Sequence, residues 1–274
     1  MDRCTVLLEN CKSELKSAKV APGLSLLIEA KKQKFLFDFG SNDVFLYNAK
    51  LMNINLNDLD FVAISESHFK HASGFISYID QCAPKKLIVG KEFFYPKYSQ
   101  KKGVLTYLGC GFDKELLKEK NIPLTEVDDF HKICDGLYFM NNFEKRFSFE
   151  NIPNRFVRDN NDIIERDQYK DEMVIIIENE DSLTLITSTS RQGILSTITK
   201  VNEKFEKKVT RVISGINVTD VDDLSVEMTV KYLVKLGVKE TFIIKANDDK
   251  LKDAINRTRS IHAHHVSIGD IIMI

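Results

Sequence analysis

Short runs that are apolar at nearly every position constrain the fold of this chain more than any other feature of its sequence. The run Val174–Ile177 is apolar throughout and rich in β-branched residues, which is typical of a strand covered on both faces. Similar runs, most of them bounded by Gly, Asn, Asp or Lys, occur at Thr5–Leu8, Leu24–Glu29, Lys34–Phe39, Phe61–Ile64, Lys86–Val89, Met173–Ile177, Leu183–Thr187, Thr210–Ile213 and Thr241–Ile244. The sequence therefore predicts sheets that lie between other layers of structure.

Helical patterns alternate with these runs near both ends of the chain. They predict helices over Asp43–Met52, Ser73–Gln81, Gln192–Phe205 and Asp222–Leu236, with Ile194, Leu195, Ile198 and Val201 on the buried face of the third and Leu224, Met228, Tyr232 and Leu233 on that of the fourth. Alternating strands and helices indicate the α/β class. We expect a single domain over residues 1–274, with irregular segments within 91–172, where Pro96, Pro123 and Pro153 lie.

The charge balance argues against nucleic-acid and membrane partners. The chain has 39 Lys and Arg against 40 Asp and Glu, a formal net charge of -1, so no overall field attracts it to a polyanion. We find neither a signal peptide nor a stretch of about 18 apolar residues that would span a membrane. The five cysteines are odd in number and lack C-x-x-C spacing, which favours reduced thiols. We therefore expect a cytoplasmic protein.

A pair of histidines follows the apolar run Phe61–Ile64. The segment from 61 to 74 reads Phe-Val-Ala-Ile-Ser-Glu-Ser-His-Phe-Lys-His-Ala-Ser-Gly, so His68 and His71 are three residues apart. This segment resembles the Ser-His-x-His-x-Asp-His motif of the metallo-β-lactamase superfamily, which follows a strand and precedes a small residue and Gly. The turn Phe37-Asp38-Phe39-Gly40 similarly resembles the Phe-Asp-Thr-Gly turn that precedes the motif in that superfamily.

Later segments resemble one branch of the superfamily, the dihydropterin-type synthases and related metal-dependent hydrolases. Residues 183–194, Leu-Thr-Leu-Ile-Thr-Ser-Thr-Ser-Arg-Gln-Gly-Ile, resemble that branch's strand followed by Gly-Cys-Ser-His-x-Gly-Ile. Residues 212–217, Val-Ile-Ser-Gly-Ile-Asn, resemble its Ile-Gly-Gly-Phe-His. The resemblance implies a four-layer αββα sandwich whose cleft, at the strand ends, is covered by the segments within 91–172.

The resemblance also implies a metal site, and this sequence departs from it. The family's metal-binding positions fall here on Glu66, His68, Lys70, His71, Arg191, Asn217 and Asn247. The two retained histidines, His68 and His71, are the residues that would still hold zinc or another divalent metal. Lys70 and Arg191 place positive charge where the family binds cations, which disfavours a metal. Neither a metal nor another cofactor is therefore expected.

A hypothesis for the charge of the cleft follows from these replacements. Lys70, helped by Arg191, would supply the positive charge that a metal brings in the family. It would pair with Glu66 and with Asp38 in a supporting role, so that the carboxylates stay neutralised.

The run Thr187–Ser190 precedes Arg191 at a strand-to-helix turn. Its hydroxyl groups fit an N-cap for the following helix, and the alternative interpretation is an anion site formed by Ser188, Ser190 and Arg191. A nucleophilic Ser190 with a histidine base is disfavoured, because Gln192 is not the small neighbour that a nucleophile elbow requires. Further along, His262 and His264 alternate toward one face, which fits surface or adventitious metal binding.

Three functions are compatible with these residues, and no catalytic residue is assigned. The first is a binding or regulatory pseudoenzyme that keeps the fold and takes a small anionic ligand. The second is a divergent metal-dependent hydrolase in which Glu66, His68 and His71 hold a single ion. The third is an interaction module whose cleft is packed shut. The sequence favours the first and does not identify its small-molecule or protein ligand.

Overall fold

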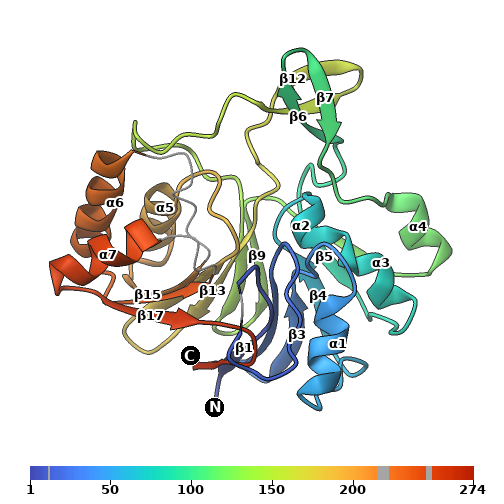
Figure 1. Ribbon diagram of the computed structural model, residues 1–274, viewed down its shortest axis with the longest axis horizontal. Helices are drawn as coiled ribbons and strands as arrows, with labels where there is room; N and C mark the ends of the chain where they lie inside the picture. The colour runs from blue at the N-terminus through green and yellow to red at the C-terminus, as the bar shows by residue number, and fades with distance from the viewer. Residues whose placement is uncertain (12, 215–221, 245–248) are drawn as a thin grey trace.

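Two seven-stranded sheets form the centre of the molecule in the computed structural model, which describes residues 1–11, 13–214, 222–244 and 249–274 (Figure 1). The first has the strand order β18 (Ile271–Met273), β1 (Arg3–Leu8), β2 (Ser25–Ala30), β3 (Gln33–Phe37), β4 (Phe61–Ile64), β5 (Leu87–Gly90) and β8 (Leu124–Val127). The second has the order β17 (His262–Val266), β16 (Glu240–Ile244), β15 (Val209–Ser214), β14 (Leu183–Thr187), β13 (Val174–Glu178), β10 (Leu137–Met140) and β9 (Phe130–Cys134). Side chains from both sheets, such as Phe35 and Ile175, share one core.

Helices cover the outer face of each sheet (Figure 1). α1 (Val44–Leu51), α2 (Phe69–Ala72), α3 (Gly74–Ile79) and α4 (Lys114–Glu119) lie beside the first sheet. α5 (Ile194–Phe205), α6 (Asp223–Leu236) and α7 (Asp249–Thr258) lie beside the second. This is a four-layer αββα sandwich, so the predicted architecture is confirmed.

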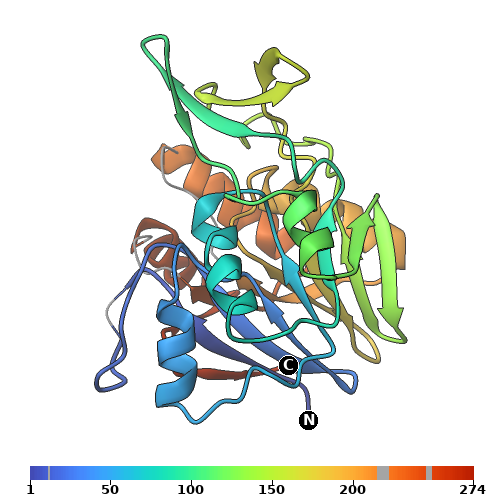
Figure 2. The same cartoon turned by 90° about the vertical axis from the view of Figure 1, so that its right-hand side faces the viewer.

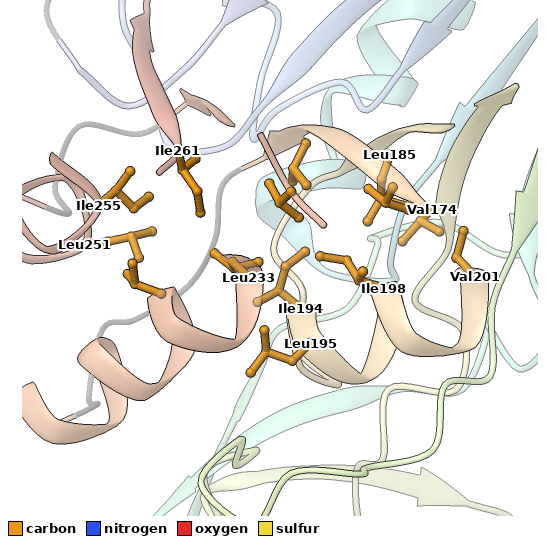
Figure 3. Packing of buried hydrophobic residues seen from close by; sticks show 14 of the residues in the cluster. Val174, Leu185, Ile194, Leu195, Ile198, Val201, Leu233, Leu251, Ile255 and Ile261 are labelled. Carbon is orange, nitrogen blue, oxygen red and sulfur yellow. The ribbon is translucent and has the colours of Figure 1, made fainter. Parts of the chain in front are cut away.

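The apolar face predicted for α5 is the one that the structure buries. Ile194, Leu195, Ile198 and Val201 are at most 3% exposed and pack toward β14 in the core of Figure 3. Burying one such side chain contributes roughly 1.5–3 kcal/mol. This packing fixes the position of the turn that precedes α5, which belongs to the site described below.

The apolar face predicted for α6 is wrong in part. Leu224 is 69% exposed, whereas Val226, Val230 and Leu233 are buried. The helix packs against both α5 and α7, so its buried face is set by two neighbours rather than by the most hydrophobic stripe of its own sequence.

The segment 91–172 contains α4 and the strands β6 to β12, although its sequence indicated irregular structure. Four of these strands form a third sheet in the order β12 (Ile163–Arg166), β11 (Phe156–Asn160), β6 (Lys97–Lys101) and β7 (Val104–Tyr107). β7 and β12 have no buried position and β6 and β11 have one or two, so these strands lack the continuous buried runs that mark the main sheets. The small sheet projects from the sandwich (Figure 2). No helix in the described ranges is both long and apolar enough to cross a membrane.

Candidate functional site

The site lies at the ends of β3, β4 and β14. β3 ends because Asp38 has a φ of 64°, a conformation that leaves the extended region. The Asp38 carboxylate then accepts the backbone N–H of Ser65 at 2.7 Å and the hydroxyl of Ser65 at 2.8 Å, which ties the end of β3 to the end of β4. The structure gathers the following residues there: Asp38, Glu66, His68, His71, Ser188, Ser190 and Arg191. Asn217 and Asn247 lie outside the described residues.

Both ring nitrogens of His71 already have partners. Nδ1 lies 2.8 Å from Asp38 Oδ2 and 2.8 Å from Ser188 Oγ. Nε2 lies 3.2 Å from Thr189 Oγ1 and 3.3 Å from Glu66 Oε1. The imidazole is 1% exposed, so these contacts take the place of water. His71 therefore connects the ends of all three strands.

Glu66 and Arg191 form a buried ion pair. Arg191 Nε lies 3.4 Å from both carboxylate oxygens of Glu66, and Thr189 Oγ1 donates to Oε1 at 3.2 Å. Burial alone would raise the pKa of Glu66, but the charge of Arg191 opposes burial most strongly, and the pKa lies well below its usual value. The guanidinium carbon also lies 5.3 Å from the ring centroid of Phe156 and 5.4 Å from that of Tyr169. Two aromatic rings thus lie beside the guanidinium of the pair.

Lys70 does not have the role that the sequence hypothesis gave it. It is half-buried in the first turn of α2, and its ammonium lies 6.0 Å from the ring centroid of Phe69. No ion pair between Lys70 and Glu66 occurs among the described contacts, and Arg191 takes that place. The pairing predicted for Lys70 is therefore wrong, while that for Arg191 agrees with the geometry.

His68 caps the N-terminus of α2 and is held neutral. Its Nδ1 accepts the backbone N–H of Lys70 at 3.2 Å, and its ring stacks on Phe69 with centroids 4.8 Å apart. Burial lowers the pKa of His68 well below its usual value, although the charge of Glu66 opposes the shift. The folded protein therefore resists protonation of this imidazole.

The protonation of His68 gives a pH prediction. A group with a depressed pKa in the folded state contributes stability that is complete above its unfolded value and is lost as the pH falls. We expect the wild-type free energy of unfolding to decrease below about pH 6.5, by up to about 1.4 kcal/mol per pH unit from this residue. In His68→Asn the side-chain oxygen still accepts the Lys70 amide, so this variant should lose less stability between about pH 7.5 and 5.5 in urea titrations. Parallel pH profiles would contradict the assignment.

A second buried ion cluster lies against the site, and the sequence analysis missed it. Lys97 Nζ lies 2.5 Å from Asp171 Oδ1, 3.3 Å from Asp167 Oδ2 and 4.3 Å from the ring centroid of Tyr169. Burial disfavours its charge, but Asp171 and Asp167 raise the pKa of Lys97 above its usual value. Asp171 also accepts the backbone N–H of Ser67 at 2.7 Å. These bonds hold the small sheet and the 167–172 loop over the strand ends.

The amides around the start of α5 are occupied by two carboxylates of the chain itself. Glu172 accepts the backbone N–H groups of Arg191 at 2.6 Å and Gln192 at 2.9 Å. Glu150 accepts those of Leu195 at 2.7 Å and Ser196 at 3.1 Å. Burial, followed by the charge of Glu66, raises the pKa of Glu172 to about 8. The amides of the turn and the first turn of α5 are thus bonded to carboxyl groups of the chain itself.

Ser188 and Ser190 do not converge on a shared anion. Ser188 Oγ lies beside His71 Nδ1, and Ser190 Oγ lies 3.3 Å from Thr187 Oγ1. Neither hydroxyl caps α5, whose N-cap residue is Gly193 without a side-chain bond. Any Cβ at Gly193 would lie 2.2 Å from Glu150 Oε2, so glycine leaves the room that the Glu150 carboxylate fills. The backbone amides beside these hydroxyls are bonded to Glu172 and Glu150, and the anion site of Ser188, Ser190 and Arg191 stays a prediction.

The donor set does not fit the metal site that the fold implies. Zinc needs lone pairs from three or four converging side chains and room for water. Here the His71 nitrogens are engaged by Asp38, Ser188 and Thr189, and Glu66 is paired with Arg191. Across the described ranges, no three His, Cys, Asp or Glu side chains are grouped so that they could hold a metal ion.

Comparisons with known proteins agree with the fold. No protein-family model matches the chain. The 7,8-dihydropterin-6-methyl-4-(beta-D-ribofuranosyl)-aminobenzene-5'-phosphate synthase of Methanocaldococcus jannaschii is 27% identical over 243 residues, covering 80% of this chain and 78% of that protein. An uncharacterized protein of the same organism is 25% identical over 219 residues, covering 77% of this chain and 78% of its own.

Comparison with solved structures also supports the four-layer fold. Tm1679, described as a metal-dependent hydrolase of the beta-lactamase superfamily, superimposes with a TM-score of 0.84 at 23% identity, covering 100% of this chain and 99% of its own. The short form of human tRNase Z matches with a TM-score of 0.56 at 9% identity over 99% of both chains. The chain therefore has the fold of these metallo-β-lactamase-type structures, and in sequence it is similar to the dihydropterin-type synthase of Methanocaldococcus jannaschii.

Proposed function

We propose that this protein is a binding or regulatory member of its superfamily in which an internal ion pair has replaced metal-dependent hydrolysis. The Glu66–Arg191 pair carries the proposal. These residues stand at two positions where the family's metal-binding histidines fall, and in this chain they bind each other. Two residues that neutralise each other's charge do not provide a set of metal ligands. Without a metal, no water is activated for hydrolysis.

The charges of the cluster support this view. Its buried carboxyl groups are Asp38, Glu66, Asp167, Asp171 and Glu172, and its fixed cations are Lys97 and Arg191. A divalent ion beside Glu66 would lie next to the Arg191 guanidinium, and like charges a few ångströms apart repel strongly where water is scarce. Arg191 and Lys97 therefore supply the positive charge that the carboxylates need.

The ligand class that fits best is a small anion. The Arg191 side chain remains 12% exposed while that of Glu66 is 1% exposed, so Arg191 is the member of the pair that solvent reaches. An anionic group could exchange with Glu66 as the partner of this guanidinium. The similar synthase is named for a product that bears a 5'-phosphate, which supports the same class.

Metal content tests the proposal directly. We expect protein purified without a polyhistidine tag to contain far less than one zinc, iron or manganese ion per chain by elemental mass spectrometry. We also expect its melting temperature to be unchanged when these metals are added back. Millimolar inorganic phosphate, used as an anionic probe, should raise the melting temperature of the wild type more than that of Arg191→Met.

The alternative hydrolase makes the opposite prediction. If Glu66, His68 and His71 held a single ion, the wild type would retain about one ion per chain and His68→Ala would lose it. That result would overturn the proposal. An absent metal together with no response to phosphate would instead favour a cleft that is packed shut and binds no small anion.

A further inference from the structure

The edge strand β7 of the small sheet is open along one side. β7 pairs only with β6 within the described sheets, and all four of its residues are exposed. Val104 is 65% exposed, Leu105 40% and Tyr107 51%. The strand belongs to the hairpin that projects from the body of the molecule (Figure 2). An apolar edge of this kind exposes backbone groups that can pair with another chain.

The register shows which backbone groups face outward. Leu108 N–H donates to Lys97 O at 2.8 Å, and Thr106 and Val104 stand opposite Ser99 and Lys101. Because successive residues of a strand direct their N–H and C=O groups to opposite sides, positions 104, 106 and 108 bond toward β6. Leu105 and Tyr107 therefore present their N–H and C=O groups at the open edge.

We propose that β7 pairs antiparallel with β7 of a second copy of this chain, around a twofold axis at Thr106. The sequence Val104-Leu105-Thr106-Tyr107-Leu108 has the same apolar pattern in both directions about Thr106. In this register Leu105 and Tyr107 exchange backbone hydrogen bonds with Tyr107 and Leu105 of the second copy. Their side chains meet as aliphatic–aromatic pairs on one face, and Val104 meets Leu108 of the second copy on the other.

The charges near β7 are compatible with this pairing. Lys101 and Lys102 are exposed and form no ion pair with a described residue. An antiparallel arrangement places the lysines of the two copies at opposite ends of the paired strands, where their repulsion is screened. Each lysine pair then approaches the segment that follows β7 in the other copy, which carries exposed Asp113 and Glu115. The chain thus offers an isologous, self-complementary surface.

The mass of the protein in solution tests the pairing. We expect concentration-dependent dimerisation of the wild type by sedimentation velocity at micromolar concentrations, as befits a small interface. Leu105→Pro removes an N–H that bonds nothing within β6–β7 and should give a monomer. Leu105→Val keeps that N–H and should still dimerise. Equal melting temperatures would show that the variants are folded. A wild type that stays monomeric throughout, or a Leu105→Pro variant that dimerises equally, overturns the proposal.

Cysteine cross-linking tests the register itself. A non-hydrogen-bonded antiparallel pair has Cα atoms about 4.5 Å apart, within the range that a disulfide spans. Thr106→Cys should therefore form a covalent dimer under mild oxidation. Val104→Cys, also on an exposed position but opposite Leu108 of the second copy, should not cross-link above the level of the wild type with its own cysteines. Equal cross-linking of the two variants contradicts the twofold axis at Thr106.

Discussion

Replacing Arg191 with methionine should lower the free energy of unfolding by about 3–5 kcal/mol, because it leaves the carboxylate of Glu66 buried without a counter-charge. Glu66 is fully buried, and its other contacts are the Thr189 hydroxyl and the His71 ring. Methionine keeps the unbranched apolar stem of Arg191 and lacks the guanidinium, whose carbon lies over the rings of Phe156 and Tyr169. Urea denaturation at neutral pH measures the effect.

Two control variants isolate the ion pair. In Arg191→Met with Glu66→Gln no charge is left unpaired, so most of the loss should be recovered, and the double-mutant cycle gives the coupling. Lys70→Met removes a cation of the same motif that forms no ion pair with Glu66, and it should change stability little. If Lys70→Met lowered stability more than Arg191→Met, Lys70 rather than Arg191 would be the cation that neutralises Glu66, as the sequence hypothesis held.

The contribution of Glu66 to the pH dependence of stability should change sign in the Arg191 variant. In the wild type the depressed pKa of Glu66 contributes stability above its unfolded value, and this contribution is lost on acidification. Without Arg191, burial becomes the dominant influence and raises the pKa of Glu66. The stability from this residue is then greatest at low pH and falls as the pH rises. If the Arg191→Met variant loses less stability than the wild type when the pH is lowered, the buried carboxylate of Glu66 is the source of its instability at neutral pH.

The half of the site that lies between residues 38 and 71 could be predicted from sequence. Asp38, Glu66, His68 and His71 follow two adjacent strands, and the resemblance gave both their order and their common cleft. The pair between Arg191 and Glu66 joins residues 125 positions apart, and its existence could be inferred only because both stand at aligned positions. Which of two nearby cations reaches a buried carboxylate depends on side-chain direction, and the sequence does not specify that direction.

The other half of the site left no local pattern in the sequence. Lys97 lies 74 residues from Asp171 and looks like one more surface lysine between Pro96 and Tyr98. Its burial results from the small sheet, whose strands lack continuous apolar runs. A buried lysine is recognised by its partners, and those partners lie in a loop whose polar residues resemble a solvent-exposed turn. The sequence therefore could not predict ion pairs between residues that lie far apart along the chain.

Replacing Lys97 with methionine should also lower the free energy of unfolding by about 3–5 kcal/mol, because Asp167 and Asp171 would then share a buried site without a cation. Lys97 is 2% exposed, and both carboxyl groups are 1% exposed. The same loss should loosen the 167–172 loop, since Asp171 links Lys97 to the amide of Ser67. Urea denaturation measures the first effect, and hydrogen exchange of the Ser67 amide measures the second.

A surface pair of the same chemistry provides the control for Lys97. Lys91 lies 2.6 Å from Asp128, yet their side chains are 57% and 61% exposed, so solvent screens the pair and Lys91→Met should leave stability nearly unchanged. Adding Asp171→Asn to Lys97→Met should recover part of the loss by removing one unpaired charge. If Lys97→Met lowered the free energy of unfolding as little as Lys91→Met, aromatic contacts would be what holds the small sheet over the strand ends. In that case the ionic cluster would not be what keeps the strand ends covered.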